Sequence, residues 1–140
     1  MQKPTPEITK QSEPFWQACK EGRLLIMNCK HCGKPFFYPR RSCPSCWSEE
    51  VEWLESKGHG TVWTLSKVAI SLWGDAWDDA VPYTVAVIDL DEGVRMASRL
   101  VGGSEWKIGD RVQVTFQPGE NEVVMPYFTS AEQPAPGLAR

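Results

Sequence analysis

The stretch that decides the fold is Cys29-Lys30-His31-Cys32, followed after ten residues by Cys43-Pro44-Ser45-Cys46. Two Cys-x-x-Cys pairs present four thiolates, a set that suits one tetrahedral Zn²⁺ ion. Gly33 follows the first pair, where a glycine can adopt positive φ and let the turn close around the metal. Because all four ligands come from the protein, no coordination position is left for water or substrate. We therefore expect one structural zinc ion held by Cys29, Cys32, Cys43 and Cys46.

Three other uses of the four cysteines are two disulfides, a redox pair and an iron site of the rubredoxin type. The first 13 residues are polar and carry no apolar signal stretch, so an oxidising compartment is not indicated. A thioredoxin-like site needs one Cys-x-x-Cys at a strand-to-helix junction rather than two in tandem. An iron site would use the same four thiolates and stays open as the alternative.

Composition and charge bound the remaining possibilities. Trp, Val, Thr, Gly and Pro are well represented among the 140 residues, which favours β structure. No run of about 18 apolar residues is present, so we expect a cytoplasmic protein without a membrane partner. The net charge is −3, but residues 20–41 carry +5 and the rest of the chain −8. A basic ribbon on an acidic body favours an anionic ligand there, although a solvated charged face explains the charge equally well.

Local signals divide the chain into five parts. Ser12 is a candidate N-cap, and Gly22 is a helix stop. Short apolar segments at 24–28, 36–38 and 51–55 predict strands that carry the two Cys-x-x-Cys pairs. The expected parts are a flexible arm (1–11), an N-terminal helix (12–22), a zinc ribbon (23–57), an OB-fold (58–130) and a loose tail (131–140).

Five further strands are predicted after the ribbon, at 61–70, 83–90, 94–100, 111–117 and 122–128. Their order is a meander followed by a return, and a Gly-rich crossover from 102 to 109 separates the third strand from the fourth. This arrangement favours a small closed barrel of the OB type. The expected fold class is therefore mainly β: an N-terminal helix and a rubredoxin-like zinc ribbon, followed by a five-stranded OB-fold barrel.

The order of these pieces resembles a known family over about residues 12–130. The matching motifs include Pro14-Phe15-Trp16, Gly22-Arg23-Leu24, both Cys-x-x-Cys pairs, Pro39-Arg40, Gly60-Thr61-Val62, Pro82-Tyr83, Asp91-Glu92-Gly93 and Met125-Pro126-Tyr127-Phe128. They are similar to the zinc-ribbon/OB-fold proteins of acyl-CoA metabolism, formerly catalogued as a domain of unknown function. Two places depart from that family. Trp47 stands where a glycine is usual, and residues 71–81 replace a more Pro-rich segment.

The resemblance implies a non-catalytic subunit of a thiolase-like enzyme, which makes or cleaves a C–C bond of an acyl-CoA. The subunit would stabilise its partner in a hetero-oligomer and help to bind the CoA thioester. An acyl-CoA hydratase or aldolase is the alternative partner. For the CoA phosphates we expect Lys34, Arg40 and Arg41, because basic side chains next to the ribbon can bind them. For contact with the partner or the acyl group we expect Phe15, Trp16, Trp73 and Trp77.

Two other functions compete with this interpretation. Catalysis by the chain alone would need Cys19 as nucleophile with His59 as base, but Cys19 on an apolar helix face is more simply a small buried residue. We expect no activity without a partner. Nucleic-acid binding suits both a ribbon and an OB-fold, but the barrel arginines are opposed by acidic residues rather than forming a continuous positive groove. It is the weaker alternative.

Overall fold

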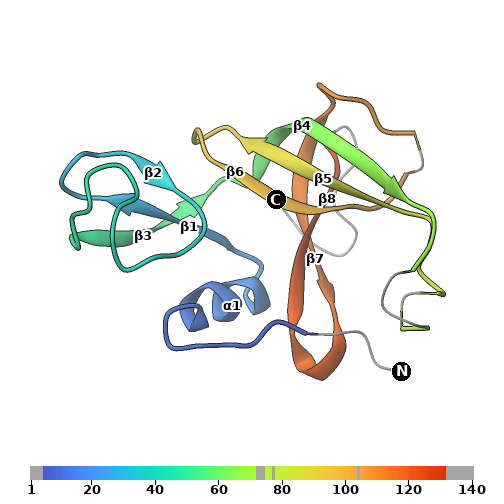
Figure 1. The fold of residues 1–140 in the computed structure, drawn as a ribbon, viewed down its shortest axis with the longest axis horizontal. Coiled ribbons are helices and arrows are strands. Elements are labelled where there is room, and N and C mark those ends of the chain that lie inside the picture. The colour runs from blue at the N-terminus through green and yellow to red at the C-terminus, as the bar shows by residue number, and fades with distance from the viewer. Residues whose placement is uncertain (1–4, 72–74, 77, 104, 132–140) are drawn as a thin grey trace.

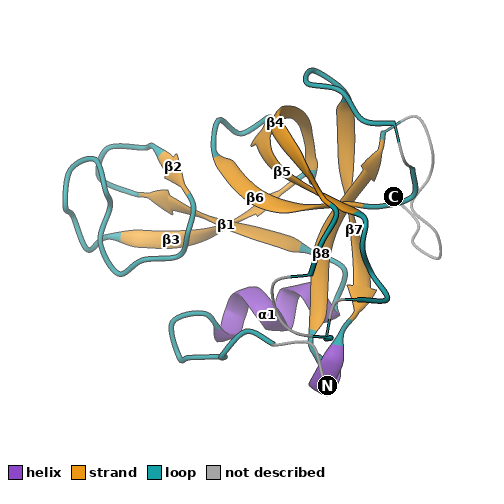
Figure 2. Ribbon diagram, turned by 45° about the vertical axis from the view of Figure 1, so that its right-hand side comes forward, coloured by secondary structure: helices purple, strands orange, loops and turns teal. Residues whose placement is uncertain are grey.

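The computed structural model describes residues 5–71, 75–76, 78–103 and 105–131 (Figure 1). A small ribbon sheet lies beside a closed barrel, and one helix lies below the join between them (Figures 1 and 2). This arrangement confirms the predicted fold class. Along the chain the elements are α1 (Glu13–Lys20), β1 (Leu24–Cys29), β2 (Pro35–Phe36), β3 (Val51–Ser56), β4 (His59–Val68), β5 (Tyr83–Leu90), β6 (Arg95–Leu100), β7 (Arg111–Pro118), the 3₁₀ turn η1 (Glu120–Glu122) and β8 (Val124–Ser130).

Helix α1 ends where the sequence predicts a stop. Gly22 has a φ of 77°, and its N–H donates to the Cys19 carbonyl at 3.1 Å. The Arg23 N–H donates to the Ala18 carbonyl at 2.9 Å, which completes a Schellman motif. Ser12 is the N-cap residue, but its side chain does not cap the helix and instead accepts a hydrogen bond from the Thr9 N–H. The helix is therefore fixed mainly at its C-terminal end.

The ribbon is a three-stranded antiparallel sheet in the order β2-β1-β3. Strand β1 is buried along almost its whole length, and its two halves join different cores. Leu24 and Ile26 pack with the buried face of α1 and with the barrel, whereas Met27 and Cys29 belong to the small core around the two Cys-x-x-Cys turns, which we call the knuckles. This shared strand links the ribbon to the rest of the molecule. Strand β2 is shorter than predicted and ends at Phe36, so Phe37 and Tyr38 lie in a loop.

The barrel closes in the order β4-β5-β6-β8-β7, the strand order of an OB-fold. Strands β6 and β8 meet in parallel, and the other neighbours are antiparallel. Strand β4 begins at His59, two residues earlier than predicted, because Gly60 pairs with Leu90. A Cβ on Gly60 would meet the Ile88 side chain at 2.7 Å, so only glycine fits at this crossing.

Ribbon and barrel are also joined by hydrogen bonds at the β3–β4 connection. The Glu92 carboxylate, in the turn between β5 and β6, accepts from Ser56 Oγ at 2.8 Å and from the Lys57 N–H at 2.9 Å. Ser56 Oγ in turn accepts from the Gly58 N–H at 3.0 Å. Within the described residues, no helix has the length and apolar character needed to cross a membrane.

Candidate metal centre and ligand site

The four predicted cysteines come together at one end of the ribbon. Cys29 ends β1, Cys32 follows in the next turn, and Cys43 and Cys46 lie in the loop between β2 and β3. Their sulfur atoms all lie within 4.8 Å of one another. Cys29 Sγ is 3.6 Å from Cys46 Sγ, and Cys32 Sγ is 3.7 Å from Cys43 Sγ. All five cysteines of the chain lie in its described part and are free thiols.

These distances fit a tetrahedral metal ion. A metal–sulfur bond of about 2.3 Å places neighbouring sulfurs of a tetrahedron about 3.8 Å apart. Both of these sulfur pairs are close to that edge, so the four thiols need little rearrangement to hold an ion. A donor set of four sulfurs suits zinc and also iron. A metal ion bound here would compensate the thiolate charges and hold the two knuckles together.

The two knuckles have the same backbone design. The N–H of the first cysteine in each donates to the carbonyl five residues later, from Cys29 to Lys34 and from Cys43 to Ser48. The residue after each second cysteine, Gly33 or Trp47, returns a hydrogen bond to the first cysteine's carbonyl. Backbone N–H groups also donate to the sulfurs, from Cys32 to Cys29 Sγ and from Ser45 to Cys43 Sγ. Such bonds stabilise thiolate and orient it for a metal.

The protein surroundings shift the thiol pKa values in opposite directions. Burial raises the pKa of Cys43, but hydrogen bonds from the Cys46 and Ser45 backbone outweigh it, and the pKa falls to about 6. At Cys46 a backbone hydrogen bond from Ser48 lowers the pKa, but burial and the neighbouring sulfurs raise it to about 11. Adjacent thiolates repel one another unless a cation lies between them. The cluster therefore favours cation binding over four free thiolates.

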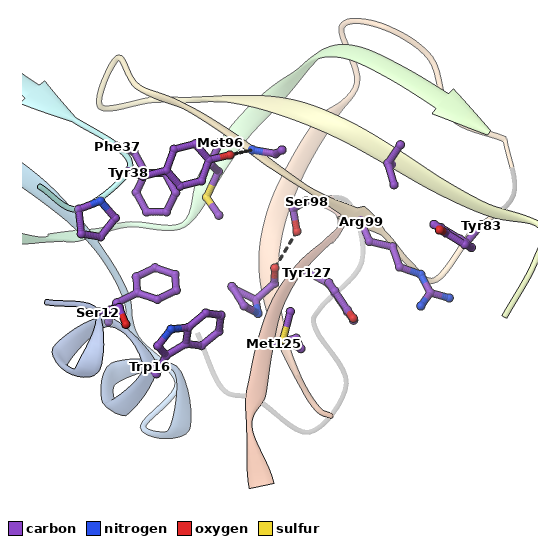
Figure 3. A pocket seen from close by; sticks show the side chains of 15 residues that line it. Ser12, Trp16, Phe37, Tyr38, Tyr83, Met96, Ser98, Arg99, Met125 and Tyr127 are labelled. Atoms are coloured by element: carbon purple, nitrogen blue, oxygen red, sulfur yellow. Dashed lines mark hydrogen bonds between the residues drawn. The ribbon is translucent and has the colours of Figure 1, made fainter. Parts of the chain in front are cut away.

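A hollow lies away from the cysteines, between α1, the loop after β2, and strands β5, β6 and β8 (Figure 3). Its volume is about 530 Å³. Phe15 and Trp16 come from the helix and Phe37 and Tyr38 from the ribbon loop, so the structure brings two of the four predicted aromatic contacts to this cavity. Phe15 is 5% exposed and belongs to the core, whereas Trp16 is partly exposed. Trp73 and Trp77 lie outside the described residues.

The predicted phosphate-binding residues separate into two places. Arg40 and Arg41 line a second hollow of about 480 Å³ beside the ribbon, together with Lys10. Glu49 and Glu52 also line it, so its charge is mixed. Lys34 is exposed and is not among the residues lining this hollow. Lys10 lies in the expected N-terminal arm, and its distance in sequence from the ribbon gave no signal that it joins the arginines.

Cys19 does not have the character of a nucleophile. It is 1% exposed within the main core, and burial raises the pKa of its thiol to about 12. A neutral buried thiol is unreactive. Among the described residues, the four metal-site cysteines are the one group of three or more His, Cys, Asp or Glu side chains placed to bind a metal.

One feature of the cavity was not expected from the sequence. Arg99 lines it from β6, with its guanidinium carbon 5.2 Å from the Tyr83 ring centre and 5.6 Å from that of Tyr127 (Figure 3). These three residues come from β5, β6 and β8, which are neighbours in the barrel, although β7 separates β8 from β6 in the sequence. Outward positions on three adjacent barrel strands are the signal that could have grouped them.

The fold and the cysteine site define the class of protein: a four-cysteine ribbon joined to an OB-fold barrel. More particularly, the chain belongs to the ChsH2 (DUF35) family. Residues 16–52 match the model of the ChsH2 rubredoxin-like zinc ribbon domain, and residues 53–117 match that of the ChsH2 C-terminal OB-fold domain. The resemblance stated from the sequence motifs is thereby confirmed.

Similar proteins support this assignment. The chain is 33% identical over 73% of its length to a DUF35 domain-containing scaffold protein of Methanocaldococcus jannaschii, of which it covers 74%. It is 31% identical over 81% of its length to the benzoylsuccinyl-CoA thiolase subunit BbsA of Geobacter metallireducens, of which it covers 77%. It is also 31% identical over 92% of its length to a probable enoyl-CoA hydratase alpha subunit of Thermomonospora curvata, but it spans only 40% of that protein.

A solved structure gives the same picture. The structure described as Ltp2-ChsH2(DUF35) aldolase matches with a TM-score of 0.80 and 28% identity, covering 91% of this chain and 99% of that one. Relatives of this chain are thus named as subunits or components of thiolase, hydratase and aldolase systems.

Proposed function

We propose that this chain is a cytoplasmic, non-catalytic subunit of a thiolase-type complex, where it stabilises the partner enzyme and helps to bind the acyl-CoA. The observation that carries the proposal is a combination: four cysteines that close a metal site, beside a mainly apolar cavity with no nucleophile–base pair among its described lining. A metal with four protein ligands offers no reactive position. The chemistry would then belong to a partner.

The metal in this proposal is one structural zinc ion per chain. The short sulfur–sulfur distances and the N–H···S hydrogen bonds support it, because both suit four thiolates around a tetrahedral ion. The five free thiols also suit a reducing compartment such as the cytoplasm.

The CoA part of the proposal rests on Arg40 and Arg41. Both are exposed side chains on the ribbon, and they share a hollow of about 480 Å³ with Lys10. Guanidinium groups bind phosphate oxygens through paired hydrogen bonds. Arg41→Ala should weaken the binding of CoA by about 10-fold in calorimetry. Lys107→Ala is the control, because Lys107 is exposed on the barrel's crossover loop. Equal losses in both variants would remove the CoA role from the ribbon.

The partner face would include α1 and its Trp16. This side chain is partly exposed at the edge of the cavity, and tryptophan is enriched among the residues that dominate binding energy at interfaces. Similar proteins keep a second partner class open, because a probable hydratase subunit and an aldolase are among them.

Co-expression tests the proposal and separates the partner classes. The chain, tagged, is expressed with a thiolase-like enzyme from the same genome and, in a parallel culture, with an acyl-CoA hydratase or aldolase candidate. We expect the chain to form a stable complex with the thiolase. We also expect the thiolase activity to fall or disappear when the chain is left out. Separate purification of the two proteins, with a thiolase fully active alone, would contradict it. A complex with the other enzyme instead would move the chain to the second class.

The structure of the barrel gives little support for nucleic-acid binding. Arg111 pairs with Asp91 through two hydrogen bonds of 2.8 Å, Arg95 lies 4.0 Å from the centre of the Trp63 ring, and Arg99 lies between two tyrosines. Arg111 and Arg95 are thus engaged by neighbouring side chains, and Arg99 lines the apolar cavity, so the three arginines have separate surroundings rather than one continuous groove. A salt-sensitive gel shift with single-stranded oligonucleotides would revive this alternative.

A further inference from the structure

The cavity between α1 and the barrel has the dimensions of a small-molecule site. Its volume of about 530 Å³ lies within the range of roughly 300–1,000 Å³ typical of ligand pockets. Aromatic and aliphatic side chains dominate the described lining, including Trp16, Phe37, Met96 and Met125. The helix and the ribbon loop form one wall and the barrel strands form the other (Figure 3). A hollow of this size has room for the apolar body of a small organic molecule.

One charged side chain lies among the described residues that line this cavity, and it is Arg99. Its Nε atom is buried and has no hydrogen-bond partner. A buried N–H without an acceptor costs free energy, and the cost is larger for a charged group. The described part of the lining has no Asp or Glu to neutralise the guanidinium. An acceptor supplied by a ligand would remove this cost.

The surroundings of Arg99 keep its guanidinium available and fix its position. The rings of Tyr83 and Tyr127 flank the group at 5.2 and 5.6 Å, distances at which cation–π attraction holds it. The other polar groups nearby are used within the protein: Ser98 Oγ donates to the Pro126 carbonyl at 2.7 Å, and the Ala97 N–H donates to Tyr38 Oη at 3.5 Å. Arg99 is thus the charged group of the described lining that can bind an anionic ligand atom.

Arg99 also borders two smaller hollows, of about 380 Å³ beside the β7–β8 turn and about 220 Å³ beside the end of β6. Arg99 therefore lies where the three hollows adjoin, and Glu120 and Lys67 line the two smaller ones. A ligand with its apolar part in the main cavity would bring a polar end group to this junction. The geometry favours an elongated ligand with a charged group at one end only.

We propose that this cavity binds a small organic carboxylate, with its aromatic or alkyl body between α1 and the barrel and its carboxylate on Arg99. A carboxylate matches the planar guanidinium and supplies the acceptor that Nε lacks. The apolar lining explains why an organic anion fits better than an inorganic one. The inference goes beyond the accessory role and does not depend on it, because every described part of the site belongs to this chain.

Calorimetry on the full, metal-loaded chain tests the inference with matched probes. 4-Phenylbutanoate should bind with a Kd of about 1 mM or lower. 4-Phenylbutanamide, which keeps the body but loses the charge, should bind about 10-fold more weakly. Inorganic phosphate, which lacks the body, should not bind at this site. Equal affinity for the acid and the amide, preferred binding of phosphate, or no binding of the acid at about 10 mM would each overturn the proposal.

Two variants and one control assign the binding to this cavity. Arg99→Gln should weaken 4-phenylbutanoate about 10-fold and abolish the preference over the amide. Arg95→Gln is the control, because Arg95 is on the same strand but packs on Trp63. Ala97→Phe fills the cavity from an exposed lining position and should reduce the binding of acid and amide alike. This variant keeps the site testable if the Arg99→Gln protein does not fold. Unchanged binding in a folded Arg99→Gln or Ala97→Phe protein contradicts the site.

Because the assay uses the chain alone, its result is separate from that of the co-expression experiment. A chain that binds its thiolase partner but not the carboxylate would keep the proposed function and lose this site. A chain that binds the carboxylate through Arg99 but no partner would keep the site and lose the proposed function.

Discussion

Gly33 and Trp47 occupy equivalent positions in the two metal knuckles and share the left-handed backbone region, with φ values of 76° and 67°. Each donates its N–H to the carbonyl of the first cysteine of its knuckle, at 2.8 and 2.9 Å. The turn therefore requires this conformation whatever the side chain. For a residue with a Cβ, this left-handed conformation costs about 1–2 kcal/mol. Trp47 is 80% exposed, so burial offsets little of that cost.

Exchanging the residue types at these two positions should have opposite effects. Gly33→Ala should destabilise the metal-loaded protein by about 1 kcal/mol, because a Cβ there meets no atom within 4 Å and only the backbone is strained. Trp47→Gly relieves strain but gains unfolded-state entropy of about 0.4–1 kcal/mol, so its effect should lie between neutral and slightly stabilising. Urea denaturation measures both. A Trp47→Gly protein as unstable as Gly33→Ala would mean that the Trp47 side chain stabilises the fold.

The metal content of the protein should depend on the four ribbon cysteines and not on Cys19. Cys43→Ser removes one of four clustered thiolates and should lower zinc from about one ion per chain to a small fraction, while loosening the ribbon. Cys19→Ala is the matched control, since Cys19 lies in the main core, and it should keep its metal. Elemental analysis of reduced protein gives the stoichiometry. Iron in place of zinc would favour the rubredoxin-type alternative, and no metal in the wild type would refute the site.

Local patterns made the ribbon and the barrel predictable. The spacing of Cys29, Cys32, Cys43 and Cys46 is a property of short turns, so four sulfurs could be grouped before their positions were known. The barrel order followed from strand lengths and from the Gly-rich crossover, because few topologies close five short strands. The ends of the strands depend on pairing with other strands, which local patterns do not reveal. Hydrogen bonding to Leu90 and Val112 extends β4 back to include Gly60, which the sequence suggests is a loop residue.

The ligand cavity could not be read from the sequence, because distant segments build it. Arg99 meets Tyr83 within the β5–β6 hairpin, but it meets Tyr127 only when β6 lies beside β8, and the opposite wall comes from α1 and the ribbon loop. Of the four aromatic residues predicted to contact the partner or the acyl group, Phe15 and Trp16 line the described cavity, whereas Trp73 and Trp77 lie outside the described residues.

The join between ribbon and barrel should depend on Glu92. Its carboxylate accepts from Ser56 Oγ and from the Lys57 N–H, and Ser56 is 4% exposed. Glu92→Ala leaves both donors without this acceptor and should cost about 1–2 kcal/mol of unfolding free energy. Faster amide exchange should appear in residues 56–58. Glu105→Ala, at an exposed position, is the control and should change stability by less than about 0.5 kcal/mol. A Glu92→Ala protein with wild-type stability and exchange would show that the connection holds without this carboxylate.

The Asp91–Arg111 pair should give the protein a small acid-sensitive contribution. The hydrogen bond from Arg111 holds the pKa of Asp91 below its ordinary value. Partial burial of Asp91 opposes this shift, and the positive charge of Arg111 adds to it. A folded pKa below the unfolded one adds stability above the unfolded pKa, about 3.9, and this stability is lost as pH falls through the folded pKa. Both side chains are about half exposed, so solvent limits the gain to about 0.5 kcal/mol.

Asp91→Asn should therefore be slightly less stable than wild type at pH 7 and equal to it well below pH 4, as measured by urea denaturation across pH. Arg111→Gln should reproduce the same profile, and a difference that persists undiminished in acid would assign the effect to the turn backbone instead.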